Sequence, residues 1–293
     1  MSATAASSRA DRPSTDGIVD AHMHVWRADR AAYPWLADVP SISRTFDVGD
    51  VADEQAVVGV TDVVLVQAAD NVDDTENMLR AAQRYAQVAG VVAWVPLREP
   101  DGTEALLDRW RHERIVGVRH LVHRDPDPNF LRDPAVNEVL DLLSGRGLAF
   151  DVCAETTHLL GLIPGLAERH PQLTLVVDHL GKPPIRERGW EPWASRLADA
   201  AEAPNVVAKL SGLNTAAAPG ATRDDYAPYV EHALDVFGPD RVMYGGDWPF
   251  ALLAAASYQQ IWEPLRGCLD ALDVGARHAV LAGTARRTYR LAR

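Results

Sequence analysis

Two histidines separated by a single residue close the first apolar run of the chain. They are His22 and His24, in the segment IVDAHMHV that starts at Ile18. Side chains two residues apart on a strand point to the same side, so both imidazoles would face one point. Two convergent imidazoles suit Zn²⁺ or a similar divalent ion. Two hydrogen-bonded histidines in the core are the alternative that this pattern leaves open.

Two further groups with metal-ligand chemistry end later apolar runs. His179 follows LTLVVD, and Asp247 follows a pair of glycines. If the runs form a closed barrel, its last strand adjoins its first, and Asp247 reaches the two histidines. The alternatives are that Asp247 caps a surface turn with Trp248, and that Asp178 points inward in place of His179. The expected metal ligands are His22, His24, His179 and Asp247.

The elements that must position these groups are eight short apolar runs rich in β-branched residues. Their first residues lie 24 to 44 positions apart, which leaves room for one helix and two short loops each time. Near-continuous apolar runs are typical of strands that are covered on both faces. Strand–helix alternation eight times over predicts an α/β fold, a single-domain (β/α)₈ TIM barrel, with an open doubly wound sheet as the competing architecture. The runs start at Ile18, Asp62, Val91, Ile115, Leu148, Leu173, Val206 and Arg241.

The segments between the runs carry helix signals. Thr75–Ala89 places small and apolar residues along one stripe. Pro134–Leu143 begins with a proline, favoured in a first turn, and Asp133 before it is an expected N-cap. Ala227–Phe237 runs into a Gly-Pro stop. The longest irregular stretch, residues 27–50, is expected to leave the first strand as a loop and to cover the barrel mouth.

Composition excludes several classes of protein. The formal net charge of −12 repels phosphate backbones, so we expect no nucleic-acid partner. No apolar run approaches the roughly 20 residues of a membrane span, so we expect no membrane partner. Two cysteines, Cys153 and Cys268, are too few for a disulfide framework, which favours the cytoplasm. Residues 1–17 are small, polar and without an apolar core, so we expect a disordered tail there and the barrel over residues 18–293.

Seven segments together resemble the amidohydrolase superfamily, in its lactonase branch of sugar-lactone hydrolases. They run in the expected order from Ile18 to about Pro249, which is nearly all of the expected barrel. Each segment alone is a weak signal, and their combination is specific. The segments are IVDAHMHVW, YPWL, VLVQAAD, GVRHLVHRDPDPNFL, LTLVVDHLGKPP, VVAKLSGL and RVMYGGDWP.

The resemblance implies a barrel that hydrolyses an ester bond within a ring. It places the four ligand candidates around the metal or the reactive water. One departure from the wider superfamily stands at the fourth run, where Arg119, His120 and His123 occur and no carboxylatable lysine or glutamate does. A dinuclear site is therefore not expected. The branch includes members that need no metal, so one divalent ion, with zinc as the first choice, and no ion at all both stay open.

Opening a lactone requires an activated water, a polarised carbonyl and a proton for the leaving alkoxide. We expect Asp247 to be the base, helped by His179 and by any ion that lowers the pKa of the water. Arg119 is the expected partner of the oxyanion or of the product carboxylate, with a salt bridge at the barrel rim as its alternative. His120 is the expected proton donor, although only one of these two neighbours can face inward from a regular strand.

Substrate-binding candidates lie at other ends of the runs. Aromatic faces can pack on the C–H side of a sugar ring, and polar side chains can bind its hydroxyls. Arg119 and Lys209 are the clearest cations at strand ends, and Arg27, Arg124 and Lys182 are expected further out on loops. Candidates that bind hydroxyl groups outnumber these cations, and together with the net charge of −12 they favour a neutral aldonolactone with a five- or six-membered ring, of a six-carbon or 6-deoxy sugar. The candidates are Trp26, Gln67, Trp94, Asp151, His158, Lys209 and Trp248.

Three functions compete at this stage. The first is a sugar lactone hydrolase, a carboxylic ester hydrolase acting on a small-molecule lactone. The second is a metal-dependent decarboxylase or another amidohydrolase of the same superfamily. The third is a catalytically silent sugar-binding barrel, which would have no use for Asp247 beside two histidines. Whether the chain forms a homo-oligomer is left open.

Overall fold

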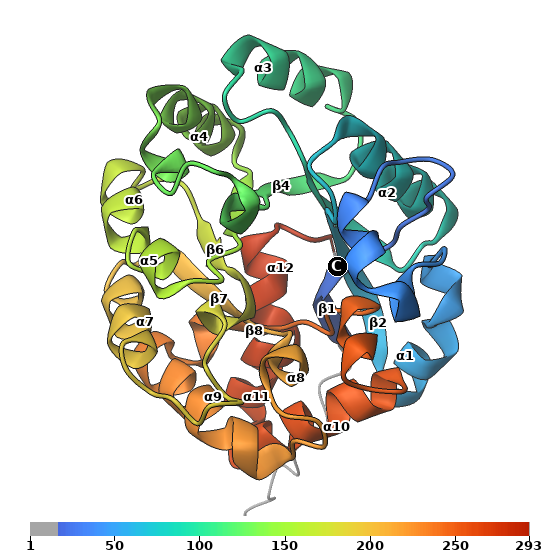
Figure 1. Cartoon of the computed structure of the whole chain (residues 1–293), viewed down its shortest axis with the longest axis vertical. Helices are drawn as coiled ribbons and strands as arrows, with labels where there is room; N and C mark the ends of the chain where they lie inside the picture. The colour runs from blue at the N-terminus through green and yellow to red at the C-terminus, as the bar shows by residue number, and fades with distance from the viewer. Residues whose placement is uncertain (1–16, 293) are drawn as a thin grey trace, which may run out of the picture.

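Eight parallel strands surround a central axis in the order of the sequence (Figure 1). The computed structural model describes residues 17–292, so the tail expected at residues 1–17 falls outside the described residues except for Gly17. A parallel bridge between Met23 and Trp248 brings the first and last strands together. The strands are β1 Ile18–Met23, β2 Val60–Val66, β3 Val88–Ala93, β4 Ile115–His120, β5 Ala149–Val152, β6 Leu175–Val177, β7 Val206–Leu210 and β8 Val242–Tyr244.

Helices cover the outside of the strand ring, as Figure 1 shows. The expectation of a single-domain (β/α)₈ barrel is thereby confirmed. Within residues 17–292, no helix is both long and apolar enough to cross a membrane. The helices are α1 Ala52–Val58, α2 Val72–Arg84, α3 Pro100–Arg109, α4 Pro134–Arg146, α5 Thr157–Leu160, α6 Ile163–Arg169, α7 Trp193–Ala201, α8 Leu213–Ala216, α9 Arg223–Phe237, α10 Tyr258–Leu269, α11 Val274–His278 and α12 Thr284–Thr288.

The ends of the helices match local capping residues more closely than they match the limits of the apolar stripes in the sequence. Helix α2 begins after Asn71, whose side chain accepts a hydrogen bond from the Asp74 amide at 2.9 Å. It stops at Arg84, five residues before the predicted end, because Val88 already begins β3. Asp133 caps α4 as expected, by accepting from the Ala135 amide at 2.9 Å. Helix α9 starts four residues earlier than predicted because Thr222 forms a capping box.

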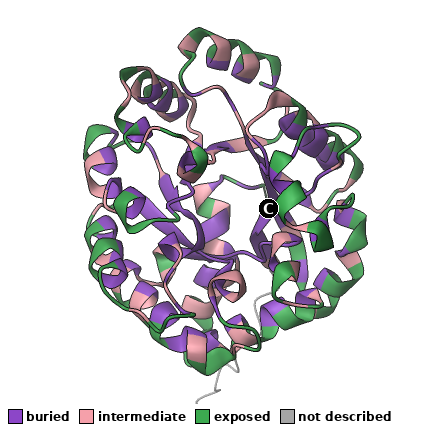
Figure 2. Cartoon of the chain, viewed as in Figure 1, coloured by how far each residue is buried: buried purple, intermediate pink, exposed green. Residues whose placement is uncertain are grey.

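The barrel has two apolar cores, and Figure 2 shows buried strands inside a partly exposed ring of helices. The larger core packs the helices on the outer faces of the strands. The smaller core joins strand residues such as Val19, Ala21 and Val64 to the end of the chain, including Ala285 and Tyr289. Helix α12 lies behind the centre of the strand ring in Figure 1, so the chain's last helix closes one end of the barrel and leaves the other end for the site.

Candidate active site

A pocket opens where the carboxyl ends of the strands meet, the face on which (β/α)₈ enzymes build their sites. Ends of β1, β4, β5, β6 and β8 contribute to it, and the segment 27–50 folds over it as expected. The residues that line it are His24, Trp26, Trp35, Ala68, Arg119, Leu121, His123, Arg124, Cys153, Glu155, His179, Lys182, Asp247 and Phe250.

An irregularity in β1 sets the directions in which the side chains of His22 and His24 point. Asp20 pairs with Val63 and Met23 with Leu65, so three steps on β1 face two steps on β2, which is a bulge. His22 is fully buried below the pocket, and His24 stands at its wall. The His24 Nδ1–H donates to the Val66 carbonyl at 2.7 Å, because a carbonyl can only accept. This contact leaves the Nε2 of His24 facing the pocket wall and Asp247.

Two glycines place Asp247 against β1. The Asp247 amide donates to the His22 carbonyl at 2.7 Å, and the Gly246 amide donates to Asp20 Oδ1 at 2.7 Å. A Cβ on Gly245 would stand 2.6 Å from the His22 Cβ, so only glycine allows this approach. Asp247 Oδ1 lies 3.4 Å from His24 Nε2, and Asp247 Oδ2 is buried without a hydrogen-bond partner.

The turn after β6 brings two neighbouring side chains into the barrel end. Its backbone is left-handed, with φ of 54° at His179 and 52° at Leu180, so the alternation of a strand does not apply. Asp178 points into a buried charge network, while His179 lines the pocket. The His179 Nδ1 lies 2.9 Å from Ser211 Oγ. The two orientations weighed as alternatives in the sequence thus occur together.

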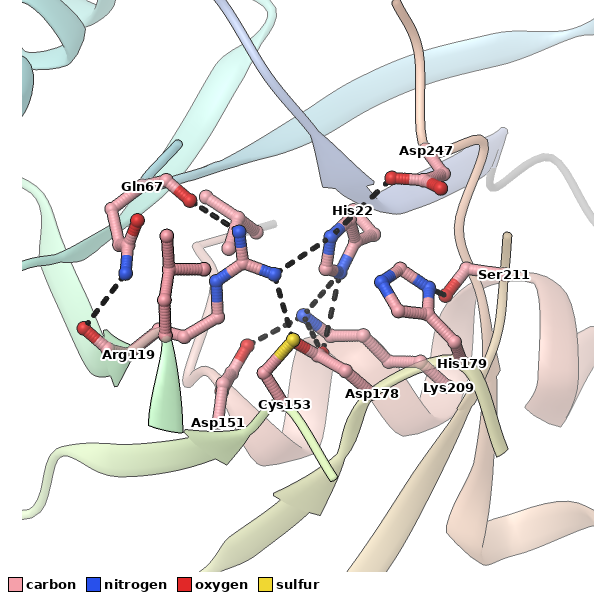
Figure 3. A network of polar contacts seen from close by, with 12 residues as sticks. His22, Gln67, Arg119, Asp151, Cys153, Asp178, His179, Lys209, Ser211 and Asp247 are labelled. Atoms are coloured by element: carbon pink, nitrogen blue, oxygen red, sulfur yellow. Dashed lines mark hydrogen bonds and ion pairs between the residues drawn. The ribbon is translucent and has the colours of Figure 1, made fainter. Parts of the chain in front are cut away.

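The buried charge network lies at the base of the pocket (Figure 3). Lys209 Nζ contacts Asp151 Oδ2 at 2.5 Å, Asp178 Oδ1 at 3.2 Å and His22 Nδ1 at 3.1 Å. Arg119 donates from one guanidinium nitrogen to Asp178 Oδ2 at 3.0 Å, and the same nitrogen lies 3.3 Å from His22 Nε2. These pairings neutralise charges that would be costly to bury alone.

Burial sets the protonation states around the pocket. It lowers the pKa of His179 to about 4, and with Lys209 it holds the pKa of His22 well below the ordinary value. Burial also works to raise the pKa of the Asp247 carboxyl, yet its interactions with His179 and His24 hold that pKa below the usual range. The buried site therefore presents the neutral imidazoles of His22 and His179 beside an ionised carboxylate near neutral pH.

The donor set fits one divalent ion. His22, His179 and Asp247 each offer one ligand atom, and these atoms all lie within 4.8 Å of one another. The unpartnered Oδ2 of Asp247 is an acceptor that a cation would satisfy. The end of β4 places Arg119 beside this set, and a guanidinium cannot bind a cation.

Several residues expected at the site lie elsewhere among the described residues. His120 accepts from the Trp94 indole at 3.2 Å and stacks on Phe130, so neither His120 nor Trp94 lines the pocket. His158 is exposed and lies 3.1 Å from the Pro128 carbonyl. Because Arg119 is the inward member of its pair, His120 is removed from the proton-donor position that the sequence suggested.

Four other candidates support the pocket from outside its lining. Trp248 packs edge-on against Phe46. Gln67 donates to Asp70 at 3.1 Å and to the Arg119 carbonyl at 3.2 Å. Asp151 and Lys209 belong to the charge network at the base of the pocket. None of the four lines the pocket.

Residues on loops contribute more of the pocket than the sequence predicted. Trp35 reaches it from the segment 27–50, with its indole donating to the Ala68 carbonyl at 2.8 Å. Arg124 and Lys182, expected further out, line the pocket as well, and Phe250 completes its aromatic side. The signal for Trp35 was present in the YPWL segment, whereas loop direction leaves no periodic trace in a sequence.

Comparison with known proteins gives consistent matches over the barrel. A profile of the amidohydrolase family matches residues 19–291. An L-fucono-1,5-lactonase of Burkholderia ambifaria is 34% identical over 94% of this chain and 96% of its own length. An L-fucono-1,5-lactonase of Burkholderia multivorans is 32% identical over 93% of this chain and 96% of its own length. A solved amidohydrolase from Burkholderia multivorans with bound zinc superposes with a TM-score of 0.87 at 30% identity, covering 94% of this chain and 100% of that one.

Proposed function

The chain belongs to the amidohydrolase family, and on that premise we propose that it hydrolyses a sugar lactone to the open aldonic acid. The motifs had indicated this superfamily and a likeness to L-fuconolactonase and L-rhamnono-lactonase, and the match to two L-fucono-1,5-lactonases agrees with the first of these. The expectation of a hydrolase that acts on a cyclic ester is likewise confirmed. The sugar, the water activation and the metal belong to the proposal.

The observation that carries the proposal is the unpartnered carboxylate oxygen of Asp247 at the pocket wall. An ionised carboxylate with a free lone pair can take a proton from a water molecule. That water attacks the lactone carbonyl, the bond from the carbonyl carbon to the ring oxygen breaks, and the proton passes from Asp247 to the departing ring oxygen. Asp247 thus supplies both the base and the proton donor, a role left open once His120 faces away from the pocket.

Arg119 is our candidate for stabilising the oxyanion that forms during attack. It lines the pocket from the end of β4, and its ion pair with Asp178 fixes the guanidinium plane. Fixed cationic donors at the point where negative charge develops are a large source of rate enhancement. His179, held by Ser211, would orient the attacking water from the opposite wall.

A divalent ion, where one is bound, would be held by Asp247 and the three histidines His22, His24 and His179. It would supply polarisation of the carbonyl and a lowered pKa of the attacking water. The competing arrangement has no ion, with Asp247 and the histidines acting on a hydrogen-bonded water.

The pocket walls suit a ring with one apolar and one polar face. Trp35 and Phe250, with the fully buried Trp26 packed behind Trp35, form an aromatic side that can pack on C–H groups, including the methyl group of a 6-deoxy sugar. Glu155 and Lys182 offer partners for hydroxyl groups elsewhere in the lining. We therefore propose a neutral, polyhydroxylated lactone with a five- or six-membered ring.

A proton-release assay on a panel of sugar lactones tests this function, since ring opening liberates one acid per turnover. We expect saturable acid release with at least one six-carbon or 6-deoxy aldonolactone, abolished in Asp247→Asn. Carbon dioxide release from an aromatic carboxylate without lactone opening would instead indicate a decarboxylase. Binding of sugar lactones without any acid release would indicate a silent binding barrel.

A further inference from the structure

A second group of metal-ligand side chains lies in the same pocket and takes no part in the ring-opening steps above, although one of them, Glu155, is also proposed to bind a substrate hydroxyl group. Cys153 follows β5 directly, Glu155 stands two residues later, and His123 follows β4. One ligand atom from each lies within 4.8 Å of the other two. Figure 3 labels Cys153 beside Arg119 and Asp178, apart from Asp247. The group shares no member with the His22, His179 and Asp247 set.

Direct bonding among the three side chains does not account for their proximity. Cys153 Sγ lies 3.6 Å from Glu155 Oε1, a weak thiol contact. His123 Nε2 lies 4.0 Å from Glu155 Oε2, too far for a hydrogen bond. His123 Nδ1 is also buried without a partner. Three metal-ligand side chains are therefore gathered without strong bonds to one another, and the buried His123 Nδ1 without a partner costs free energy unless something binds there.

The spacing suits a tetrahedral ion. Zinc bonds of about 2.0–2.3 Å to nitrogen, oxygen and sulfur place neighbouring ligand atoms roughly 3.3–3.8 Å apart. The Cys153 Sγ to Glu155 Oε1 separation of 3.6 Å lies within that range, and the His123 Nε2 to Glu155 Oε2 separation of 4.0 Å lies just beyond it. Cys153 is 2% exposed, and the other two side chains are partly accessible from the pocket, so an ion has an entry path.

Positive side chains in the pocket limit its affinity for a divalent cation. Arg124 and Lys182 line the same pocket and repel a cation. When an ion displaces the Cys153 proton, the thiolate formed and the carboxylate of Glu155 supply two negative charges against them, and Arg119 is already paired with Asp178. A mixed sulfur, nitrogen and oxygen set favours a borderline-soft ion over Mg²⁺ or Ca²⁺, which prefer oxygen alone.

We propose that His123, Cys153 and Glu155 form a second divalent-cation site of the zinc class. Three protein ligands leave the fourth position open to the pocket, as in sites that accept a ligand oxygen. A hydroxyl or carboxylate oxygen of the bound molecule would take that position. The site does not depend on the proposed lactonase activity, and its test needs no substrate.

Cobalt(II) titration of metal-stripped full-length protein tests this assignment, because a cysteine thiolate bound to Co²⁺ gives a charge-transfer band in the near ultraviolet. The chain has two cysteines. Cys268 is buried elsewhere, with its thiol facing the Pro264 carbonyl, so Cys268→Ser is the matched control. We expect the band in the wild type, in Cys268→Ser and in Asp247→Asn, and its loss in Cys153→Ser.

Zinc binding by equilibrium dialysis supplies the second readout. Wild type should bind one equivalent more than Cys153→Ser. Glu155 is partly exposed, so Glu155→Gln should leave the fold intact. We expect this variant to raise the dissociation constant for Co²⁺ about tenfold or more, which corresponds to a loss of roughly 1.4 kcal/mol of binding free energy. If Cys153→Ser fails to fold by circular dichroism, Glu155→Gln decides alone. No band at saturating Co²⁺, a band that survives in Cys153→Ser, or unchanged cobalt affinity in Glu155→Gln would overturn the site.

Discussion

Asp247 is held in place by its backbone, and its side chain is left free to react. The amide donates to the His22 carbonyl at 2.7 Å, and φ is 54°, a conformation that asparagine tolerates as well as aspartate. Asp247→Asn should therefore fold normally while kcat falls about 10²- to 10⁴-fold, since the amide cannot accept a proton. Steady-state kinetics beside a circular dichroism spectrum measure both. A variant that keeps more than about a tenth of the wild-type kcat would move the base elsewhere, with His179→Gln as the next test.

The Asp20 carboxylate holds the backbone of His22 on β1 and of Gly246 after β8. Its Oδ1 accepts from the His22 amide at 3.0 Å and from the Gly246 amide at 2.7 Å, while Oδ2 accepts from the Tyr258 hydroxyl at 2.7 Å. Asn at this position keeps one acceptor oxygen and turns an N–H₂ toward the remaining donors. We expect Asp20→Asn to lose about 1–3 kcal/mol in urea unfolding and to lower kcat.

Tyr258→Phe is the matched control for Asp20, because it removes one hydroxyl from the same carboxylate and leaves both backbone amides bonded. It should cost about 1–3 kcal/mol with kcat nearly unchanged, because the buried Tyr244 hydroxyl, which donates to the Tyr258 hydroxyl at 3.1 Å, also loses its partner. Equal losses of kcat in the two variants would show that Asp20 acts through the α10 packing of Tyr258 and not through the His22 and Gly246 backbone.

The residues that sequence reasoning could reach are those at ends of regular strands. His22, His24 and Asp247 follow apolar runs, and the closure of a parallel barrel brings the first and last runs together. Arg119 and His120 could not be separated, because alternation gives a relative direction and not which member faces the axis. Asp178 and His179 could not be separated either, since the left-handed turn suspends alternation.

At the scale of elements, the eight strands were predictable because each is buried on both faces and reads as a continuous apolar run. Helix boundaries were less predictable. Val88 and Ala89 continue the apolar stripe of α2, yet in the structure they belong to strand β3. The packing of α12 into the barrel end gave no signal, because its residues also read as an ordinary surface helix. What a loop covers depends on tertiary contacts that no local pattern records.

One such contact ties the segment 27–50 to the barrel. Tyr33 donates to Asp74 Oδ1 at 2.7 Å, and Asp74 Oδ2 accepts from the Ala68 amide at 2.7 Å. Ala68 in turn accepts from the Trp35 indole, so Tyr33 and Asp74 fix the aromatic wall of the pocket. We expect Tyr33→Phe to raise KM several-fold with kcat little changed, because the wall binds the ring but does not react with it.

Tyr229→Phe is the control for that variant. This substitution also removes a single hydrogen bond, which the Tyr229 hydroxyl donates to the Gly189 carbonyl at 2.8 Å, and Tyr229 does not line the pocket. Both variants should lower the free energy of unfolding by about 1 kcal/mol. A KM that rises equally in both would mean that general loosening, and not the position of Trp35, is responsible.

At the scale of the whole molecule, the charge of the pocket decides which lactone ring is accepted. Its lining carries three cations, Arg119, Arg124 and Lys182, and two carboxylates, Asp247 and Glu155. Arg119 is paired with Asp178, so the remaining balance is close to neutral, while the chain carries −12 overall. A dianionic ring would lose its hydration here with few free cations to replace it. An acid product would be repelled by the same field, which favours its release.

We therefore expect kcat/KM for the best neutral sugar lactone to exceed that for an unsaturated dicarboxylate lactone by about tenfold or more, which corresponds to roughly 1.4 kcal/mol. Both are measured by the same acid-release assay at one ionic strength, because charge interactions are screened by salt. Lys182→Gln is the matched variant, since Lys182 lines the pocket and donates to Thr215 at 3.3 Å. It should lower turnover of the dicarboxylate ring more than that of the neutral one. A dicarboxylate lactone that equals or surpasses every neutral sugar lactone tested would overturn the assignment of a neutral substrate while leaving lactone hydrolysis intact.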